Sequence, residues 1–64
     1  MFTTFSKKSE NSTLIPEFNA FGSYDEAWDF AVNIFQTGLV YGVYIGNEKG
    51  EIIWACDGKG CRNF

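Results

Sequence analysis

The clearest pattern of apolar and polar positions spans Ser23 to Leu39 and has the period of an α-helix. The apolar residues that fall on one side of such a helix are Tyr24, Ala27, Trp28, Ala31, Ile34 and Phe35. Phe30 and Val32 widen this surface, and the residues left for water are Asp25, Glu26, Asp29, Asn33 and Gln36. The pattern therefore predicts an amphipathic helix at about residues 23–38.

Both ends of this helix carry recognisable boundary signals. Ser23 followed by Glu26 is an S-x-x-E capping box, which satisfies free amides at a helix start. Gly38 offers the left-handed conformation that commonly follows a last turn. We expect Leu39 to fold back onto Ile34, as in a Schellman closure.

A second element follows, in which β-branched and aromatic residues predict two strands at residues 40–46 and 51–56. The connection Asn47-Glu48-Lys49-Gly50 predicts a type I turn that ends in a left-handed glycine, so the two strands form a hairpin. In this hairpin Asn47 faces Glu51, and the expected pairs are Ile45 with Ile53, Tyr44 with Trp54, and Val43 with Ala55.

This register assigns the side chains to two faces of the sheet. We expect the aliphatic face to pack on the helix, with Tyr41, Val43, Ile45, Ile53 and Ala55. The other face is expected to stay partly open, with Val40, Tyr44, Ile52, Trp54 and Cys56. On it, Tyr44 and Trp54 would form a cross-strand aromatic pair.

The remaining segments carry weaker patterns. Residues 1–6 allow a short edge strand, and residues 7–13 are expected to form a polar loop. In residues 14–21, Pro16 allows an edge strand or an irregular extended segment, which either covers the core or forms a docking arm. We favour the core lid and expect Phe18 to pack with Phe21 over the helix start. Residues 57–64 show no periodicity and are expected to leave the sheet. The predicted fold is α+β, a single domain with a two- or three-stranded antiparallel sheet on one helix.

The content of aromatic residues is high for a chain of 64: seven Phe, three Tyr and two Trp. So small a chain has little core, so some rings should stay exposed and mark a binding face. The net charge of −3 disfavours a nucleic-acid binder, which needs a basic surface. Without a signal-peptide pattern or an apolar run of ~20 residues, we expect a soluble cytoplasmic protein without membrane contact.

Cys56 and Cys61 are the residues that most resemble a reactive or metal site. Zinc normally takes four ligands, the chain has no histidine, and a metal would need Asp57 or a second subunit. A disulfide has suitable local flexibility, but a cytosolic chain normally keeps its thiols reduced. We therefore expect a half-buried Cys56, an incidental Cys61, and no metal or cofactor.

Catalysis is not expected, because there is no histidine and no recognisable pair of nucleophile and base. The carboxylates of Asp25, Glu26 and Asp29 are interpreted as a solvated helix face, which could form an acidic rim for a basic partner. The sequence thus favours a small non-enzymatic regulator, inhibitor or accessory factor that binds another protein. Small acidic chains rich in aromatic residues are typical of phage or mobile-element proteins with such roles. Its predicted partner-binding residues are Tyr44, Trp54, Ile52, Asp25 and Asp29. The alternatives are a single-stranded nucleic-acid binder that stacks bases on Tyr44 and Trp54, and a structural homodimer.

Overall fold

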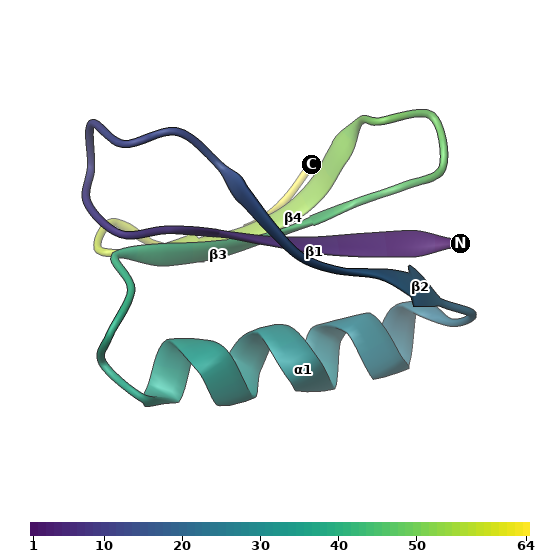
Figure 1. Cartoon of the computed structure of the whole chain (residues 1–64), viewed down its shortest axis with the longest axis horizontal. Coiled ribbons are helices and arrows are strands. Elements are labelled where there is room, and N and C mark those ends of the chain that lie inside the picture. The colour runs from purple at the N-terminus through teal and green to yellow at the C-terminus, as the bar shows by residue number, and fades with distance from the viewer.

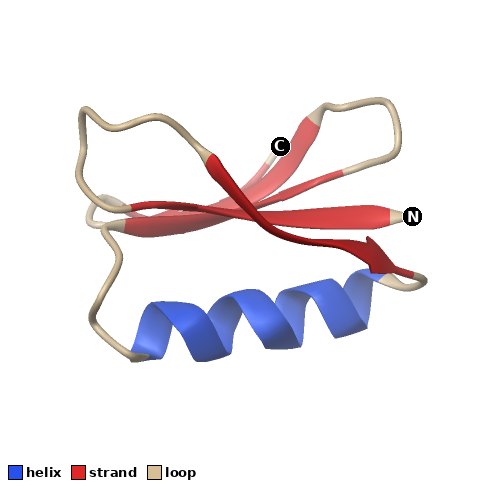
Figure 2. Ribbon diagram, viewed as in Figure 1, coloured by secondary structure: helices blue, strands red, loops and turns tan.

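A computed structural model of the chain shows one helix packed against one face of a five-stranded antiparallel sheet (Figure 1). It describes the backbone of all 64 residues and every side chain except those of residues 18–20. The elements are β1 (Phe2–Lys7), β2 (Ile15–Phe21), α1 (Tyr24–Gln36), β3 (Gly42–Gly46), β4 (Ile52–Asp57) and β5 (Gly60–Asn63). The strand order is β2-β1-β3-β4-β5, and the predicted α+β class is confirmed (Figure 2). Within the described part of the chain, no helix has the length and apolar character needed to cross a membrane.

The sheet is larger than predicted, because both ends of the chain join it. β1 is an interior strand between β2 and β3, where Thr3 to Lys7 pair with Gly46 to Gly42. The tail, expected to leave the sheet, turns back as β5 beside β4. β2 lies at the sheet edge, which agrees with the position predicted from Pro16.

The predicted helix start is confirmed. The Glu26 amide donates to Ser23 Oγ at 3.3 Å, and the Ser23 hydroxyl donates to Glu26 Oε1 at 3.0 Å. At the other end Gly38 has φ +75°, the left-handed conformation expected there. The predicted contact of Leu39 with Ile34 is wrong, because Leu39 is 81% exposed. Its amide instead donates to Thr37 Oγ1 at 3.2 Å.

The hairpin turn is also confirmed, but the predicted register beyond it is wrong by one residue. Asn47 N–H donates to the Glu51 carbonyl at 2.9 Å, and Gly50 has φ +83°. A bulge then lies where Gly46 pairs with Ile52, and one extra residue of β4 is accommodated there. The observed pairs are Val43 with Cys56, Tyr44 with Ala55, and Ile45 with Trp54.

This one-residue shift exchanges the two faces of β4. Trp54 and Cys56, expected on the open face, join Val43 and Ile45 in the core beneath α1, whereas Ala55 pairs with Tyr44 on the other face. Trp54 is 5% exposed and packs edge-on against Trp28 of the helix at 6.3 Å between ring centroids. Ala27 and Ala31 let the helix approach the sheet closely, and both are fully buried.

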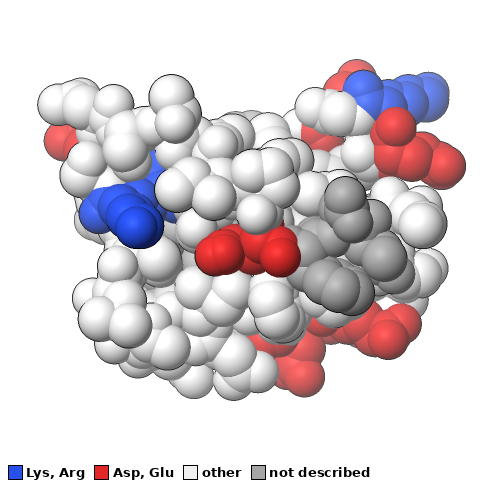
Figure 3. Space-filling view, viewed as in Figure 1, with Lys and Arg blue, Asp and Glu red and all other residues white. Residues whose placement is uncertain are grey.

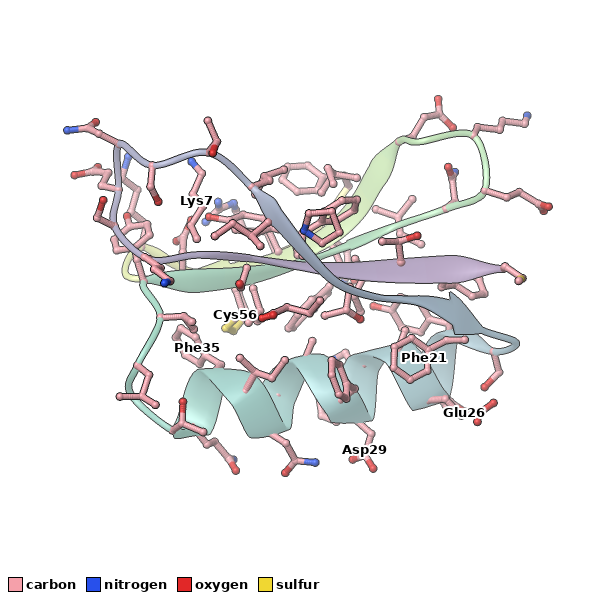
Figure 4. The ribbon with its side chains drawn as sticks, in the orientation of Figure 1. Lys7, Phe21, Glu26, Asp29, Phe35 and Cys56 are labelled. Atoms are coloured by element: carbon pink, nitrogen blue, oxygen red, sulfur yellow. A yellow bond between two sulfur atoms is a disulfide. The ribbon has the colours of Figure 1, made fainter. Side chains whose placement is uncertain are left out.

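Phe21, which precedes the helix, also packs on the side of the sheet that the helix covers. The side chain of Phe21 stacks at a tilt on Phe30 of α1, with 5.2 Å between ring centroids. In Figure 4 the labelled Phe21, Phe35 and Cys56 lie between the sheet and the helix. The predicted packing of Phe18 with Phe21 concerns a side chain outside the described residues.

Candidate functional site

The sheet face opposite α1 carries an open hollow of about 360 Å³. Its floor is formed by Tyr44 of β3 and Ala55 of β4, which pair across the two strands. Its walls are formed by Lys7, Leu14, Ile52, Arg62 and Phe64. The connection from β1 to β2 and the β3–β4 hairpin both rise from this side of the sheet (Figure 1). The hollow therefore lies on the face of the sheet that the helix does not cover.

The alternation of side chains along the strands explains why these residues line it. Val43 and Ile45 are fully buried beneath the helix, so Tyr44 between them must point to the opposite face. Trp54 and Cys56, on either side of Ala55 in β4, are likewise buried in the core, so Ala55 also points away from the helix. Ile52 reaches this face because the bulge lies between it and Trp54.

A hydrogen-bonded network joins the hollow to the start of β5. Arg62 donates to both carboxylate oxygens of Asp57, with Nη2 to Oδ2 at 3.1 Å and Nη1 to Oδ1 at 3.3 Å. The Lys59 amide donates to Oδ1 at 2.8 Å, and the Tyr44 hydroxyl lies 3.5 Å from Oδ2. Because Asp57 is only 8% exposed, these donors hold a nearly buried charge in place.

The network also sets the charges around the hollow. The hydrogen bonds from Arg62 hold the pKa of Asp57 below its ordinary value, although burial acts in the opposite direction. Burial raises the pKa of Tyr44, and the nearby Asp57 charge adds to this effect, so the phenol stays neutral near pH 7. Asp57 offsets Arg62, whereas the Lys7 ammonium lies 5.8 Å from the centre of the Tyr44 ring. The edge of the hollow is therefore cationic.

Gly42 makes this arrangement possible. A Cβ at this position would lie 2.7 Å from the Asp57 Cβ and 2.9 Å from the Tyr44 hydroxyl oxygen. Glycine in a strand often marks such a close approach. The absence of a side chain at residue 42 thus leaves the space in which Tyr44 and Asp57 meet.

Of the predicted partner-binding residues, Tyr44 and Ile52 line the hollow. Tyr44 is more covered than expected, with 8% of its surface exposed. The predicted Tyr44–Trp54 pair is wrong, because Trp54 lies on the helix-covered face of the sheet. The shared aromatic platform that the nucleic-acid alternative requires is therefore not formed.

Asp25 and Asp29 are exposed on the helix, on the other side of the molecule from the hollow. Figure 4 shows Asp29 and Glu26 pointing away from the sheet, and Figure 3 shows acidic atoms along the lower, helical edge. The prediction that these acids form a rim around the Tyr44 face is therefore wrong. An interface cannot use the hollow and these two carboxylates at once without wrapping around the domain.

Sequence reasoning missed Lys7, Leu14, Arg62 and Phe64 as lining residues. Leu14 and Phe64 are 37% and 71% exposed, and each ends a polar stretch in the sequence. Such isolated apolar residues were a usable signal. The pairing of Arg62 with Asp57 depends on β5, so it could not be recognised while the tail was expected to be irregular.

Cys56 and Cys61 form a disulfide between directly paired residues of β4 and β5. The prediction of an incidental, reduced Cys61 is therefore wrong. The thiols had been expected to stay reduced because the chain was interpreted as cytosolic. Among the described residues, no group of three or more His, Cys, Asp or Glu side chains could hold a metal ion. That the chain needs no metal or cofactor stays a prediction.

Comparisons with protein-family models, with curated proteins and with solved structures found no match for this chain.

Proposed function

We propose that the chain is a small non-enzymatic protein that binds another protein through the open face of its sheet. The observation that supports this is the hollow of about 360 Å³ on the sheet face that the helix leaves uncovered. By covering part of its partner's surface, the chain would act as a regulator, inhibitor or accessory factor.

The make-up of the hollow resembles the centre of a protein interface. Exposed apolar side chains, Leu14 and Phe64, stand beside a nearly buried tyrosine, and Lys7 and Arg62 lie at the edge. Aromatic and arginine side chains are enriched where truncation costs most binding energy. A side chain of the partner can bury its apolar surface against exposed apolar groups that stand beside an ordered floor.

The charge at this surface favours an acidic partner. Lys7 and Arg62 supply two cations, of which Asp57 offsets one. The expectation of a basic partner rested on Asp25 and Asp29, which lie on the opposite side of the molecule. In place of a basic partner, we therefore propose one that presents an apolar side chain with a carboxylate nearby.

Affinity capture from a lysate of the native host, followed by mass spectrometry, tests this proposal. Leu14→Ser and Phe64→Ala should each weaken binding of the captured protein by about 30-fold, which is about 2 kcal/mol. Leu39→Ser is the matched control, because Leu39 is 81% exposed at the helix end, away from the hollow, and should leave binding unchanged.

A protein that all four chains, wild type included, capture equally would contradict the proposal. Sedimentation that shows a stable dimer, broken by Leu14→Ser, would support the structural homodimer instead.

A further inference from the structure

The outer edge of β5 is an open hydrogen-bonding surface. β5 pairs only with β4, and all four of its residues are exposed. The Phe64 amide donates to the Ile53 carbonyl at 3.1 Å, so Phe64 and, by alternation, Arg62 direct their backbone groups toward β4. The N–H and C=O groups of Cys61 and Asn63 therefore point outward.

The two edges of the sheet differ in how they are protected. β2 contains Pro16, and its pairing with β1 has two register shifts, features that discourage a further strand. The pairing of β5 with β4 runs from Asp57–Gly60 to Trp54–Asn63 without a shift, and β5 contains no proline. Of the two edges, β5 is the one suited to accept another strand.

β5 is also fixed in position before any partner arrives. The Cys56–Cys61 disulfide joins it to β4, and Arg62 joins it to Asp57 through two hydrogen bonds. A strand that is already ordered costs little conformational entropy on binding.

We propose that β5 is the docking strand for an extended, acidic segment of the partner protein, which adds to the sheet as an antiparallel sixth strand. Within that segment a carboxylate lies opposite Arg62 and an apolar side chain packs on Phe64. Both residues also line the hollow, so side chains on that face of the added strand enter it from the side. This inference rests on the proposed function and states how the partner engages the surface.

A second copy of this chain fits the edge less well. In one antiparallel self-pairing, Cys61 pairs with Asn63 of the other copy, and the two Arg62 side chains then stand directly opposite each other. Like charges in that position destabilise a sheet, whereas a carboxylate there is favourable. The register that sets Cys61 opposite Cys61 pairs as many residues of β5, but it places Arg62 opposite Gly60 and so gives neither arginine a carboxylate to face.

A synthetic heptapeptide, acetyl-Thr-Leu-Thr-Glu-Thr-Leu-Thr-amide, is the probe. Opposite β5 its glutamate meets Arg62, its flanking threonines meet the outward groups of Cys61 and Asn63, and one leucine meets Phe64. Titration into ¹⁵N-labelled protein should shift the amide signals of Cys61 and Asn63 and slow their hydrogen exchange. N-methylation of the two flanking threonines removes the donors to β5 and should weaken binding at least about tenfold.

Two further controls separate the edge from the hollow. Replacement of the probe's glutamate by lysine should weaken binding, because a cation then faces Arg62. Asn63→Pro removes an outward donor while it leaves the Tyr44 floor intact, and it should reduce both probe binding and partner capture. If this variant does not fold, the N-methylated peptide still decides the question.

Equal binding of the parent and N-methylated peptides, or no binding of the parent, would overturn the inference. Shifts confined to Tyr44 and Ile52 would also overturn it and would leave the proposed function standing. The opposite result, edge binding of the probe with partner capture unaffected by Leu14→Ser and Phe64→Ala, would overturn the proposed function and retain the strand-addition site.

Discussion

At the scale of single residues, polar groups at buried positions are satisfied by specific hydrogen bonds. Among the described side chains, no buried nitrogen or oxygen lacks a hydrogen-bond partner. Thr4, fully buried, donates to the Ala27 carbonyl at 3.4 Å and so joins β1 to the helix. Asp57 is held by Arg62 and by the Lys59 amide. An unpartnered buried group would cost ~1–3 kcal/mol, a large fraction of the stability of so small a domain.

The cap at the start of the helix gives the first prediction. Ser23→Ala removes the acceptor of the Glu26 amide and should lower the free energy of unfolding by about 0.5–2 kcal/mol. Gln36→Ala, an exposed change in the last turn, should be nearly neutral. Urea unfolding followed by circular dichroism measures both. Identical midpoints would mean that the Ser23 hydroxyl does not stabilise the helix.

Asp57 gives a prediction about pH. Its pKa in the folded chain is lowered, so its ionised form stabilises the fold above the unfolded value of about 3.9, and this stability is lost as pH falls through the folded pKa. Unfolding free energy should therefore drop in acid. The drop should be smaller in Asp57→Asn, measured by urea titration at about pH 7 and at a series of acidic pH values. The same slope in both proteins would assign the acid sensitivity to other carboxyl groups.

At the scale of elements, α1 and the hairpin turn could be predicted because their signals are local. Ser23, Glu26, Gly38 and Asn47 act within a few residues of their own positions. The bulge at Ile52 could not be predicted, because nothing in the hairpin sequence distinguishes a ladder with one extra residue from a regular one. That single residue decided the face on which Trp54 lies, and with it half of the predicted aromatic site.

The observed register is tested by two apolar substitutions in β4. Trp54→Ala empties the space beside Trp28 and should cost about 3–5 kcal/mol of stability. Ile52→Ala, on the partly open face, should cost clearly less, since the side chain is only half buried. Thermal and urea unfolding compare the two. A loss for Trp54→Ala as small as that for Ile52→Ala would favour the register expected from the sequence, in which both side chains lie on the open face.

At the scale of the whole molecule, the class of fold could be predicted, but the size of the sheet could not. β1 and β5 depend on partners distant in sequence or on the closing disulfide, and their own residues carry weak alternation. The hollow depends on both, because Lys7 comes from β1 and Arg62 from β5. Of the site residues, Tyr44 and Ile52 were predicted and Leu14 and Phe64 carried a usable signal, whereas Lys7 and Arg62 were beyond the reach of sequence reasoning.

The disulfide gives a prediction about the assembled domain. It closes a loop of only six residues, Cys56 to Cys61, so its loss should cost about 2 kcal/mol through loop entropy. Reduction by dithiothreitol should lower the unfolding midpoint and speed hydrogen exchange at Arg62, whose N–H is directed toward β4, more than at Val43. A Cys56→Ser/Cys61→Ser double variant should behave like the reduced chain and should not respond to dithiothreitol. Unchanged stability on reduction would show that backbone pairing alone holds β5.

The interior position of β1 governs how the chain can fold during synthesis. Phe2 to Lys7 leave the ribosome before every other strand, yet their β3 partners, Gly42 to Gly46, emerge only after the helix has been made. Until then β1 can pair only with β2, and a lone two-stranded hairpin is marginal in water. The nascent chain must therefore keep an interior strand unsatisfied until Gly42 to Gly46 have been made, which makes the completed sheet a late event.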